Sequence, residues 1–381
     1  MIKKKIRDLI LVFLITFFPQ LAFTEIKELK ISQNDINILI EEKIRSPFSY
    51  SGLAAFYNEV NAYVVDIDKI NRLDDKNYHN LTPKQSLAIV GHHKIMIIYN
   101  LNTTISFVGG KITWQEGNDN SQKFNDINLQ AQLLLKSDLA NQSQLFQKLK
   151  YAYLWEPFRI LCLTTEVILL WLHSLHSFGW GITIILLSLL FKIFILPANV
   201  FLLLAQRKVS YIQASLSSEL ENIKLNFSGE EAHNKFMTAH KTKGVSPFYN
   251  LKPLFLTLVP IPFLIAIFNV LGELDLIAGN SFLWIKDLAY PDAIIDVGVH
   301  IPLLGSSINF LPIFMTLLTI LGALFHQNKI INKKELNKQK LNLYFMAFVF
   351  FILFYSFPSA MVLYWTFASI WVVIQQKFVH I

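Results

Sequence analysis

Six apolar segments separated by charged or polar stretches dominate this chain of 381 residues. Most of them approach the 20 or so apolar residues that a helix needs to cross about 30 Å of hydrocarbon. With 53% hydrophobic residues, the chain is also more apolar than an ordinary globular protein. The pattern predicts a polytopic membrane protein with spans near residues 9–23, 178–205, 253–271, 308–325, 341–357 and 359–376.

Basic residues gather in alternate connections between these segments, which predicts the orientation of the chain. Lysine and arginine precede the first segment, lie between the second and third and between the fourth and fifth, and follow the sixth. The connection over residues 272–307 has Lys286 alone among several acidic residues. Because cytoplasmic loops carry an excess of Lys and Arg, we expect both termini in the cytoplasm and residues 25–177 outside. The net charge of +7 then needs no nucleic-acid partner.

Residues 1–24 fit either a membrane anchor or a cleavable signal peptide. The small residues around position 22 match a cleavage site poorly, so we expect a retained anchor. Cys162 is the only cysteine of the chain, which excludes a disulfide framework and a cysteine-based metal site.

Residues 25–154 are polar enough to form a small extracytoplasmic α+β domain. Alternating patterns predict strands at 62–67, 87–99 and 104–114, and Gly109-Gly110 inside the last predicts a bulge or hairpin turn. Helical periodicity predicts helices at 26–43 and 128–150. His92 and His93 are adjacent, so on a strand they would point to opposite faces and could not share a metal.

Residues 155–177 predict an amphipathic helix lying along the membrane interface. Arg159, Glu166 and His173 recur every seven residues, which places them on one stripe that we expect to face water. A span here would reverse every later loop against the charge rule.

Lys192 lies inside the apolar run 178–205. A lysine at the centre of a spanning helix costs roughly 2.5 to 3.5 kcal/mol, so such residues usually face protein or a wet cavity. Snorkelling of the ammonium to the headgroups is the alternative. Ser188 and Asn199 share the helical face of Lys192 and predict a wet groove with one positive charge; Thr316, Ser356 and Ser369 are further candidates for lining it.

Residues 206–247 predict a cytoplasmic helical hairpin whose second helix begins at Gly229, after a capping pair formed by Ser228 and Glu231. The sequence contains no HExxH, GxSxG, Walker-type or GxGxxG motif. We therefore expect no enzyme, no cofactor and no metal site.

Four motifs resemble the YidC/Oxa family of membrane-protein insertases. They are Gly179-Trp180-Gly181-Ile182, with a basic residue five positions before Pro197; Ser246-Pro247 with Pro253; the segment FLWIKDL at 282–288; and FPSAMVLYWTFASIWVVIQQ at 357–376. The resemblance covers residues 155–381 and the last motif is the most specific.

This resemblance implies an insertase core at 178–381, with five transmembrane helices around a hydrophilic groove. In such a core a client's polar segment enters the groove while its apolar segment slides into the bilayer, without nucleotide hydrolysis. It also implies the bacterial inner membrane, membrane-protein clients and lipid as partners, and the Sec translocon and ribosome as further candidates. By position, Lys192 replaces the family's groove arginine, Ser188 and Thr257 match polar groove positions, and Tyr364-Trp365 match an aromatic pair that contacts clients.

Three departures from the family's pattern matter. Lysine loses the planar fork of arginine. The external domain is shorter than the usual β-sandwich, and no long basic tail follows the last span, so we do not expect tail-mediated docking on ribosomes. A secondary transporter or channel, with Lys192 in the ion or substrate path, remains the rival reading, although the sequence has no internal repeat.

Overall fold

The computed structural model describes residues 28–378, except for 32, 74–77, 100, 115–128, 247, 249–254, 257, 302–303 and 326–332. The expected anchor at residues 1–24 and the expected groove residue Thr257 lie outside the described part. The chain divides into two compact units. Unit 1 runs to Arg159 and includes Glu166–Ser177 and Glu273–Ala278; unit 2 holds Ile160–Thr165, Phe178–Gly272 and the chain from Gly279 onward.

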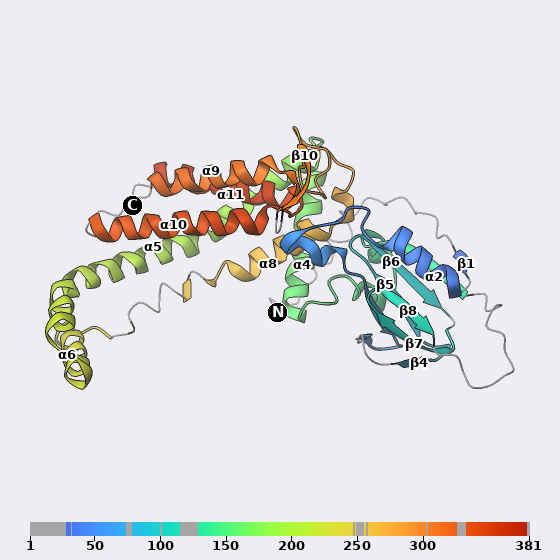
Figure 1. Cartoon of the computed structure of the whole chain (residues 1–381), viewed down its shortest axis with the longest axis horizontal. Coiled ribbons are helices and arrows are strands. Elements are labelled where there is room, and N and C mark those ends of the chain that lie inside the picture. Colours follow the sequence, from blue (N-terminus) through green and yellow to red (C-terminus); the bar gives the residue numbers. More distant parts are fainter. Residues whose placement is uncertain are drawn as a thin grey trace, which may run out of the picture. The chain divides into compact units, whose positions relative to one another are not determined.

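The described residues of unit 1 form two antiparallel sheets (Figure 1). A six-stranded sheet has the order β1-β9-β6-β5-β2-β3, and a three-stranded sheet has the order β4-β7-β8. The larger sheet buries side chains on both of its faces, in two separate hydrophobic clusters. The strands are β1 Glu28–Ile31, β2 Asn61–Val65, β3 Ile70–Arg72, β4 His79–Leu81, β5 Ser86–Val90, β6 Lys94–Tyr99, β7 Thr103–Val108, β8 Lys111–Trp114 and β9 Leu129–Leu135.

The alternating segments form strands as expected, and the glycine pair makes a hairpin turn. Strands β7 and β8 pair up to Val108 and Lys111, with Gly109 and Gly110 between them. Both glycines have positive φ, 59° and 79°, which glycine adopts without strain. The stretch 87–99 is two strands rather than one, because a turn at Gly91, His92 and His93 separates β5 from β6.

The helices expected at 26–43 and 128–150 are partly wrong. Residues 129–135 form β9, which pairs with both β1 and β6. Helix α2 (Gln33–Leu39) and a π-helical turn (Ile40–Ile44) cover only part of the first stretch; in the second, α3 (Gln144–Gln147) and the 3-10 turn Ser137–Asn141 follow the strand. The apolar residues of β9 also fit helical spacing, so cross-strand pairing decides its conformation.

The two neighbouring histidines were also wrongly placed. His92 and His93 lie in the turn, not on a strand, and their rings stack with centroids 4.0 Å apart. No group of three or more His, Cys, Asp or Glu side chains among the described residues has metal-binding geometry.

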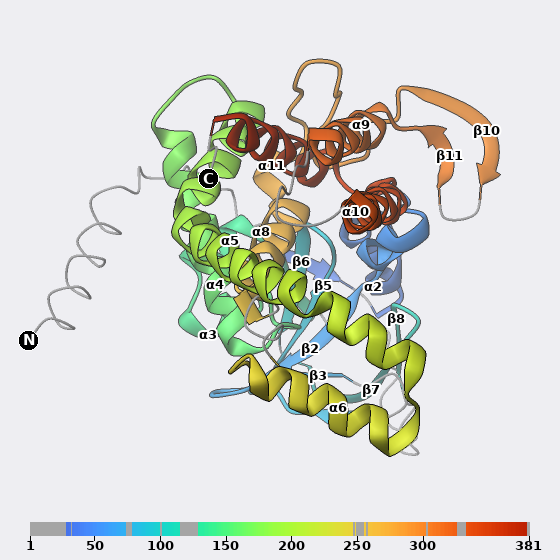
Figure 2. The same ribbon diagram turned by 90° about the vertical axis from the view of Figure 1, so that its left-hand side faces the viewer.

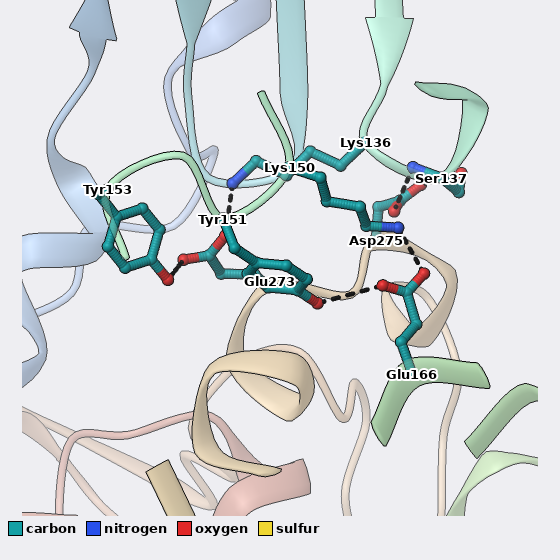
Figure 3. A network of polar contacts seen from close by, with 8 residues as sticks. All are labelled: Lys136, Ser137, Lys150, Tyr151, Tyr153, Glu166, Glu273 and Asp275. Atoms are coloured by element: carbon teal, nitrogen blue, oxygen red, sulfur yellow. Dashed lines mark hydrogen bonds and ion pairs between the residues drawn. The ribbon is translucent and has the colours of Figure 1, made fainter. Parts of the chain in front are cut away.

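Helix α4 (Glu156–Ser174) forms where a helix was expected, but its charged stripe does not simply face water. Glu166 is buried, pairs with the Nζ of Lys150 and accepts a hydrogen bond from Tyr151 at 3.3 Å (Figure 3). The expectation of a wetted stripe was wrong for Glu166, because unit 1 supplies a cation for its carboxylate. Arg159, on the same stripe, pairs with Glu156 instead.

A second ion pair of unit 1 uses the segment that follows helix α8. The Nζ of Lys136 lies 2.7 Å from an oxygen of Glu273, whose other oxygen accepts a hydrogen bond from Tyr153 (Figure 3). Ser137 donates its backbone N–H and its hydroxyl to Asp275, at 3.1 and 2.6 Å. Burial raises the pKa of the Asp275 carboxyl, while these hydrogen bonds act in the opposite direction.

The described residues of unit 2 form a helical bundle and one strand pair. Helix α11 contacts α9 and α5, and α9 also contacts α10 (Figures 1 and 2). The helices are α5 Trp180–Asn226, α6 Gly229–Thr242, α8 Ile261–Glu273, whose final residue belongs to unit 1, α9 Phe310–Phe325, α10 Lys333–Phe354 and α11 Ser359–Phe378. Strands β10 Ile295–Ile301 and β11 Gly305–Ile308 form the pair.

Two of the described helices, α4 and the Trp180–Ile212 part of α5, are long and apolar enough to cross a membrane; Ile261–Glu273, Phe310–Leu324 and Ser359–Gln375 are shorter apolar helices.

The helical hairpin expected at residues 206–247 is continuous with the helix that precedes it. Helix α5 has no break at residue 205, and α6 packs against it through a small apolar cluster around Leu216, Ile223 and Ala239. Helix α6 begins at Gly229 as expected, but the Ser228 side chain makes no capping hydrogen bond.

Candidate functional site

The two glycines at the start of α5 have separate physical roles. Gly179 precedes the helix with φ +81°, a conformation that side chains other than glycine rarely adopt. A Cβ on Gly181 would lie 2.1 Å from the ring of Phe282. Gly181 therefore lets the segment 282–288 approach the helix closely, so two of the four motifs touch each other.

Lys192 lies three turns into α5 and is half-buried. Among the described residues it has no hydrogen bond and no ion pair, whereas the buried lysines of unit 1 both have carboxylate partners. Its neighbour along the chain, Phe191, packs against Phe263 of α8 and Tyr364 of α11, at 6.1 and 6.5 Å between ring centroids. The ammonium is thus carried by a helix whose neighbouring side chains are largely apolar.

Pro197 adds a polar backbone group close to Lys192. It lies inside α5 and has no N–H, so the carbonyl of Ile193 loses its helical donor. In a membrane such a carbonyl needs water or a side-chain donor. This favours a hydrated rather than a dry surface along this part of α5.

Ser188 links α5 to α11. Its hydroxyl accepts a hydrogen bond from the indole of Trp371 at 3.0 Å and donates to the carbonyl of Ile185 at 2.7 Å. The expected face of Ser188, Lys192 and Asn199 runs along one continuous helix; Ser188 is buried, and the other two are half-buried. Trp371 was not expected to take part, although its position seven residues after Tyr364 puts both on one face of α11.

Tyr364 and Trp365, expected as an aromatic pair, face different neighbours. Tyr364 is buried near Phe191, whereas Trp365 packs against Phe350 and Phe354 of α10, at 5.7 and 5.4 Å. Only Tyr364 therefore lies on the side of the bundle that carries Lys192.

The remaining expected groove residues are spread over the bundle. Thr316 donates to the carbonyl of Pro312 in its own helix at 2.8 Å. Ser369 lies 3.4 Å from the hydroxyl of Thr319, which joins α11 to α9. Ser356 is buried, and its hydroxyl has no hydrogen-bond partner among the described residues. The structure thus brings Ser188 and Tyr364 close to the face of Lys192, and gives Thr316 and Ser369 helix-to-helix or self-capping roles.

A group of hydrogen bonds fixes the start of α9, and it was not predicted from the sequence. Asp292 accepts hydrogen bonds from the N–H groups of Phe310 and Leu311, at 3.0 and 2.8 Å, which caps the helix. Asn309 donates to the carbonyl of Tyr355 at 2.6 Å and accepts from the N–H of Ala293 at 3.0 Å. An acidic residue among apolar ones, such as Asp292, could have indicated a cap. Asp292 lies 18 residues before Phe310, however, and local capping patterns do not extend that far.

The backbone of Leu288 and Tyr290 also holds the start of α11. The N–H groups of Ser359 and Ala360 donate to the carbonyls of Tyr290 and Leu288, at 2.9 and 2.8 Å. The first turn of α11 is therefore satisfied by protein rather than by water at this end of the bundle. The backbone N–H groups at the start of α11 thus have protein acceptors. The ammonium of Lys192, by contrast, has no partner among the described residues.

The family model for the 60Kd inner membrane protein matches residues 171–381, more than half of the chain. The chain belongs to this family. The matched region contains all of α5 to α11, and with them every candidate groove residue named above. The resemblance drawn from the sequence motifs is confirmed.

Curated relatives of this 60Kd inner membrane protein family member carry the name membrane protein insertase YidC. A Chlamydia caviae protein is 29% identical over 241 residues, which cover 60% of this chain and 28% of that protein. One from Treponema denticola is 30% identical over 206 residues, 53% of this chain and 34% of the relative. The chain thus matches only about a third of the length of these relatives.

A solved structure described as an active YidC insertase with its first transmembrane domain resolved is 14% identical to this family member. It covers 84% of this chain and 83% of its own, with a TM-score of 0.34.

Proposed function

We propose that this chain is a membrane-protein insertase of the bacterial inner membrane. It inserts clients by way of a hydrophilic groove on α5, in which Lys192 is the client-contacting cation. The observation that carries the proposal is that Lys192 is half-buried and that its ammonium has no counter-ion among the described residues, in a chain of this family. Such a charge attracts the acidic, extracytoplasmic part of a client.

The proposed mechanism needs no nucleotide and no covalent chemistry. A wet groove shortens the distance over which the client's polar segment is desolvated, and burial of its apolar segment in the bilayer provides the driving force. Ser188 and Asn199 supply neutral polar groups on the face of Lys192, the carbonyl of Ile193 supplies another, and Tyr364 borders them. The proposal includes five transmembrane helices, cytoplasmic termini and an extracytoplasmic unit 1. It also includes lipid and nascent membrane proteins as partners, with the Sec translocon and the ribosome as further candidates.

Depletion of the chromosomal copy, followed by complementation, tests this function in cells. Cells would carry wild type, Lys192→Arg, Lys192→Ala or Lys192→Glu, and insertion of a small client with an acidic tail would be scored by protease accessibility. We expect Lys192→Arg to support insertion, Lys192→Ala to reduce it and Lys192→Glu to reduce it most. Lys208, which follows the apolar run on the same helix, provides the matched control, and Lys208→Glu should leave insertion close to wild type.

Two results would contradict the proposal. Equal insertion by Lys192→Glu and wild type would remove the electrostatic groove. Selective flux of ions or solutes through proteoliposomes at transporter-like rates, with no insertion of clients, would favour the transporter reading.

A further inference from the structure

The strand pair β10–β11 exposes an unusual amount of apolar surface. Ile295, Val297, Val299 and Ile301 of β10 are between 45% and 64% exposed, and Ile308 of β11 is 39% exposed. Figure 2 shows the pair projecting from the start of α9. A two-stranded hairpin has little stability by itself in water, so this surface is expected to have a partner.

Hydrogen bonds hold both ends of the hairpin at the start of α9. Asp292, before β10, accepts hydrogen bonds from Phe310 and Leu311, and Asn309, directly after β11, binds the backbone of Ala293 and Tyr355. The base of the hairpin is therefore held at the level where the apolar helix α9 begins. A membrane boundary near Phe310 would place this base at the surface of the outer leaflet.

Apolar surface continues from the hairpin onto α9. Phe310, Leu317, Leu321 and Leu324 are between 43% and 54% exposed along the helix. Phe310 also packs edge-on against Trp284 at 5.4 Å, and Trp284 is 39% exposed. Tryptophan with one apolar side and one polar group is typical of the membrane interface, and its indole N–H here reaches Asp292 at 3.3 Å.

Charge is scarce on the described part of the hairpin, which argues against a partner held by ion pairs. Asp296 is the acidic residue of β10, and it accepts a hydrogen bond from the N–H of Gly298 at 3.0 Å. Gly298 has φ +69° and lies where the strand register shifts, so the hairpin bends at this point. A bent, apolar, weakly charged ribbon fits the headgroup and upper acyl region of a bilayer.

We propose that the β10–β11 hairpin is a membrane-surface anchor that inserts its Ile and Val side chains into the outer leaflet of the lipid bilayer. The proposal rests on the membrane location that is part of the proposed function, but not on insertion of clients. Its physical consequence is local: the hairpin holds the external end of α9 at a fixed depth in the bilayer.

The experiment measures the depth of single labelled sites in the full chain. Val299→Cys carries an environment-sensitive fluorophore, with the buried Cys162 left in place. The protein is reconstituted at low density in phosphatidylcholine and phosphatidylglycerol vesicles that contain lipids with a quencher near the headgroup end of the acyl chain. Leu225→Cys is the matched control, since Leu225 is 77% exposed and apolar but lies about 30 Å beyond residue 205 along α5.

We expect a blue-shifted emission at Val299 and quenching by lipid several-fold stronger than at Leu225, with little quenching by aqueous iodide. Quenching by lipid no stronger than at Leu225 would overturn the proposal. Shielding from both lipid quencher and iodide would also overturn it, because protein rather than lipid would then cover the site. Ser306→Cys, on β11, gives a second label site if Val299→Cys does not reconstitute, with the same expected order relative to Leu225.

Discussion

At the scale of single residues, the contacts of Ser188 and Gly181 leave little freedom for substitution. Lys192 and Ser188 could be assigned to one face from their spacing alone, because a long apolar helix fixes the angle between them. The hydrogen bond from Trp371 to Ser188 could not be predicted, because it joins residues 183 positions apart. Likewise, the sequence showed Gly181 only as part of a motif. Its close contact with Phe282 in the structure shows why a glycine is needed there.

Gly181→Ala should destabilise unit 2 by about 1 to 3 kcal/mol, since a Cβ would overlap the ring of Phe282 and force one of the two segments to move. Thermal unfolding of the purified chain in detergent measures the loss. Gly322→Ala in α9 is the control, because its Cβ would meet Val373 at an ordinary 3.4 Å. We expect the double variant Gly181→Ala, Phe282→Leu to regain part of the lost thermal stability. Equal unfolding temperatures for Gly181→Ala and wild type would refute the close approach.

Asp275 should make local stability depend on pH. Burial raises the pKa of its carboxyl in the folded state, so the folded state binds the proton more tightly than the unfolded one. The stabilisation is present below the unfolded pKa and is lost as pH rises through the folded pKa. Amide hydrogen exchange of the segment around Ser137, corrected for the intrinsic rate, should slow on acidification. In Asp275→Asn this dependence should disappear; a dependence unchanged in Asp275→Asn would contradict the assignment.

At the scale of elements, sequence periodicity predicted the helices better than their boundaries. Helix α5 continues past residue 205 because nothing in its sequence breaks the helix where the apolar run ends. Strand β9 was expected as a helix, since its apolar residues fit both periods and its neighbours β1 and β6 decide between them. Strands β2, β7 and β8 were predictable because alternation and the glycine turn agree locally.

Helix α9 should lose stability when its cap is removed. Asp292→Ala leaves the N–H groups of Phe310 and Leu311 without their acceptor, at a cost of about 1 to 2 kcal/mol. The change is measured as faster amide exchange in the first turn of α9 in the detergent-solubilised chain. Asp296→Ala, which removes an exposed acceptor for one N–H group, is the control and should leave α9 unchanged. Equal exchange in the two variants would show that Asp292 is not the cap.

At the scale of the whole molecule, the family and its membrane character could be read from the sequence, while the charge pairs of unit 1 could not. Lys136 and Glu273 are 137 residues apart, and Glu273 looked like an ordinary acidic residue of an external loop. Glu166 looked like part of a wetted stripe. Both carboxylates are instead buried beside lysines, and this follows only from how the chain folds back into unit 1.

Breaking one of these pairs should cost far more than removing an exposed charge. Lys136→Met leaves the Glu273 carboxylate buried without its cation, which should lower the free energy of unfolding of unit 1 by about 3 to 5 kcal/mol. Adding Glu273→Gln should return part of this loss. Denaturant unfolding of the full chain in detergent provides the measurement, with the exposed Lys84→Met as control. A double variant less stable than Lys136→Met would contradict the pairing.

Charge reversal in a reconstituted system tests most directly whether Lys192 attracts the acidic segment of a client. Proteoliposomes carry wild type or Lys192→Glu, and the client carries either its acidic tail or the same tail with lysines in place of its carboxylates. We predict that Lys192→Glu lowers the insertion rate of the acidic client by about tenfold and restores insertion of the basic one relative to wild type. Identical rates for both clients in both proteins would show that the charge at position 192 does not select what enters.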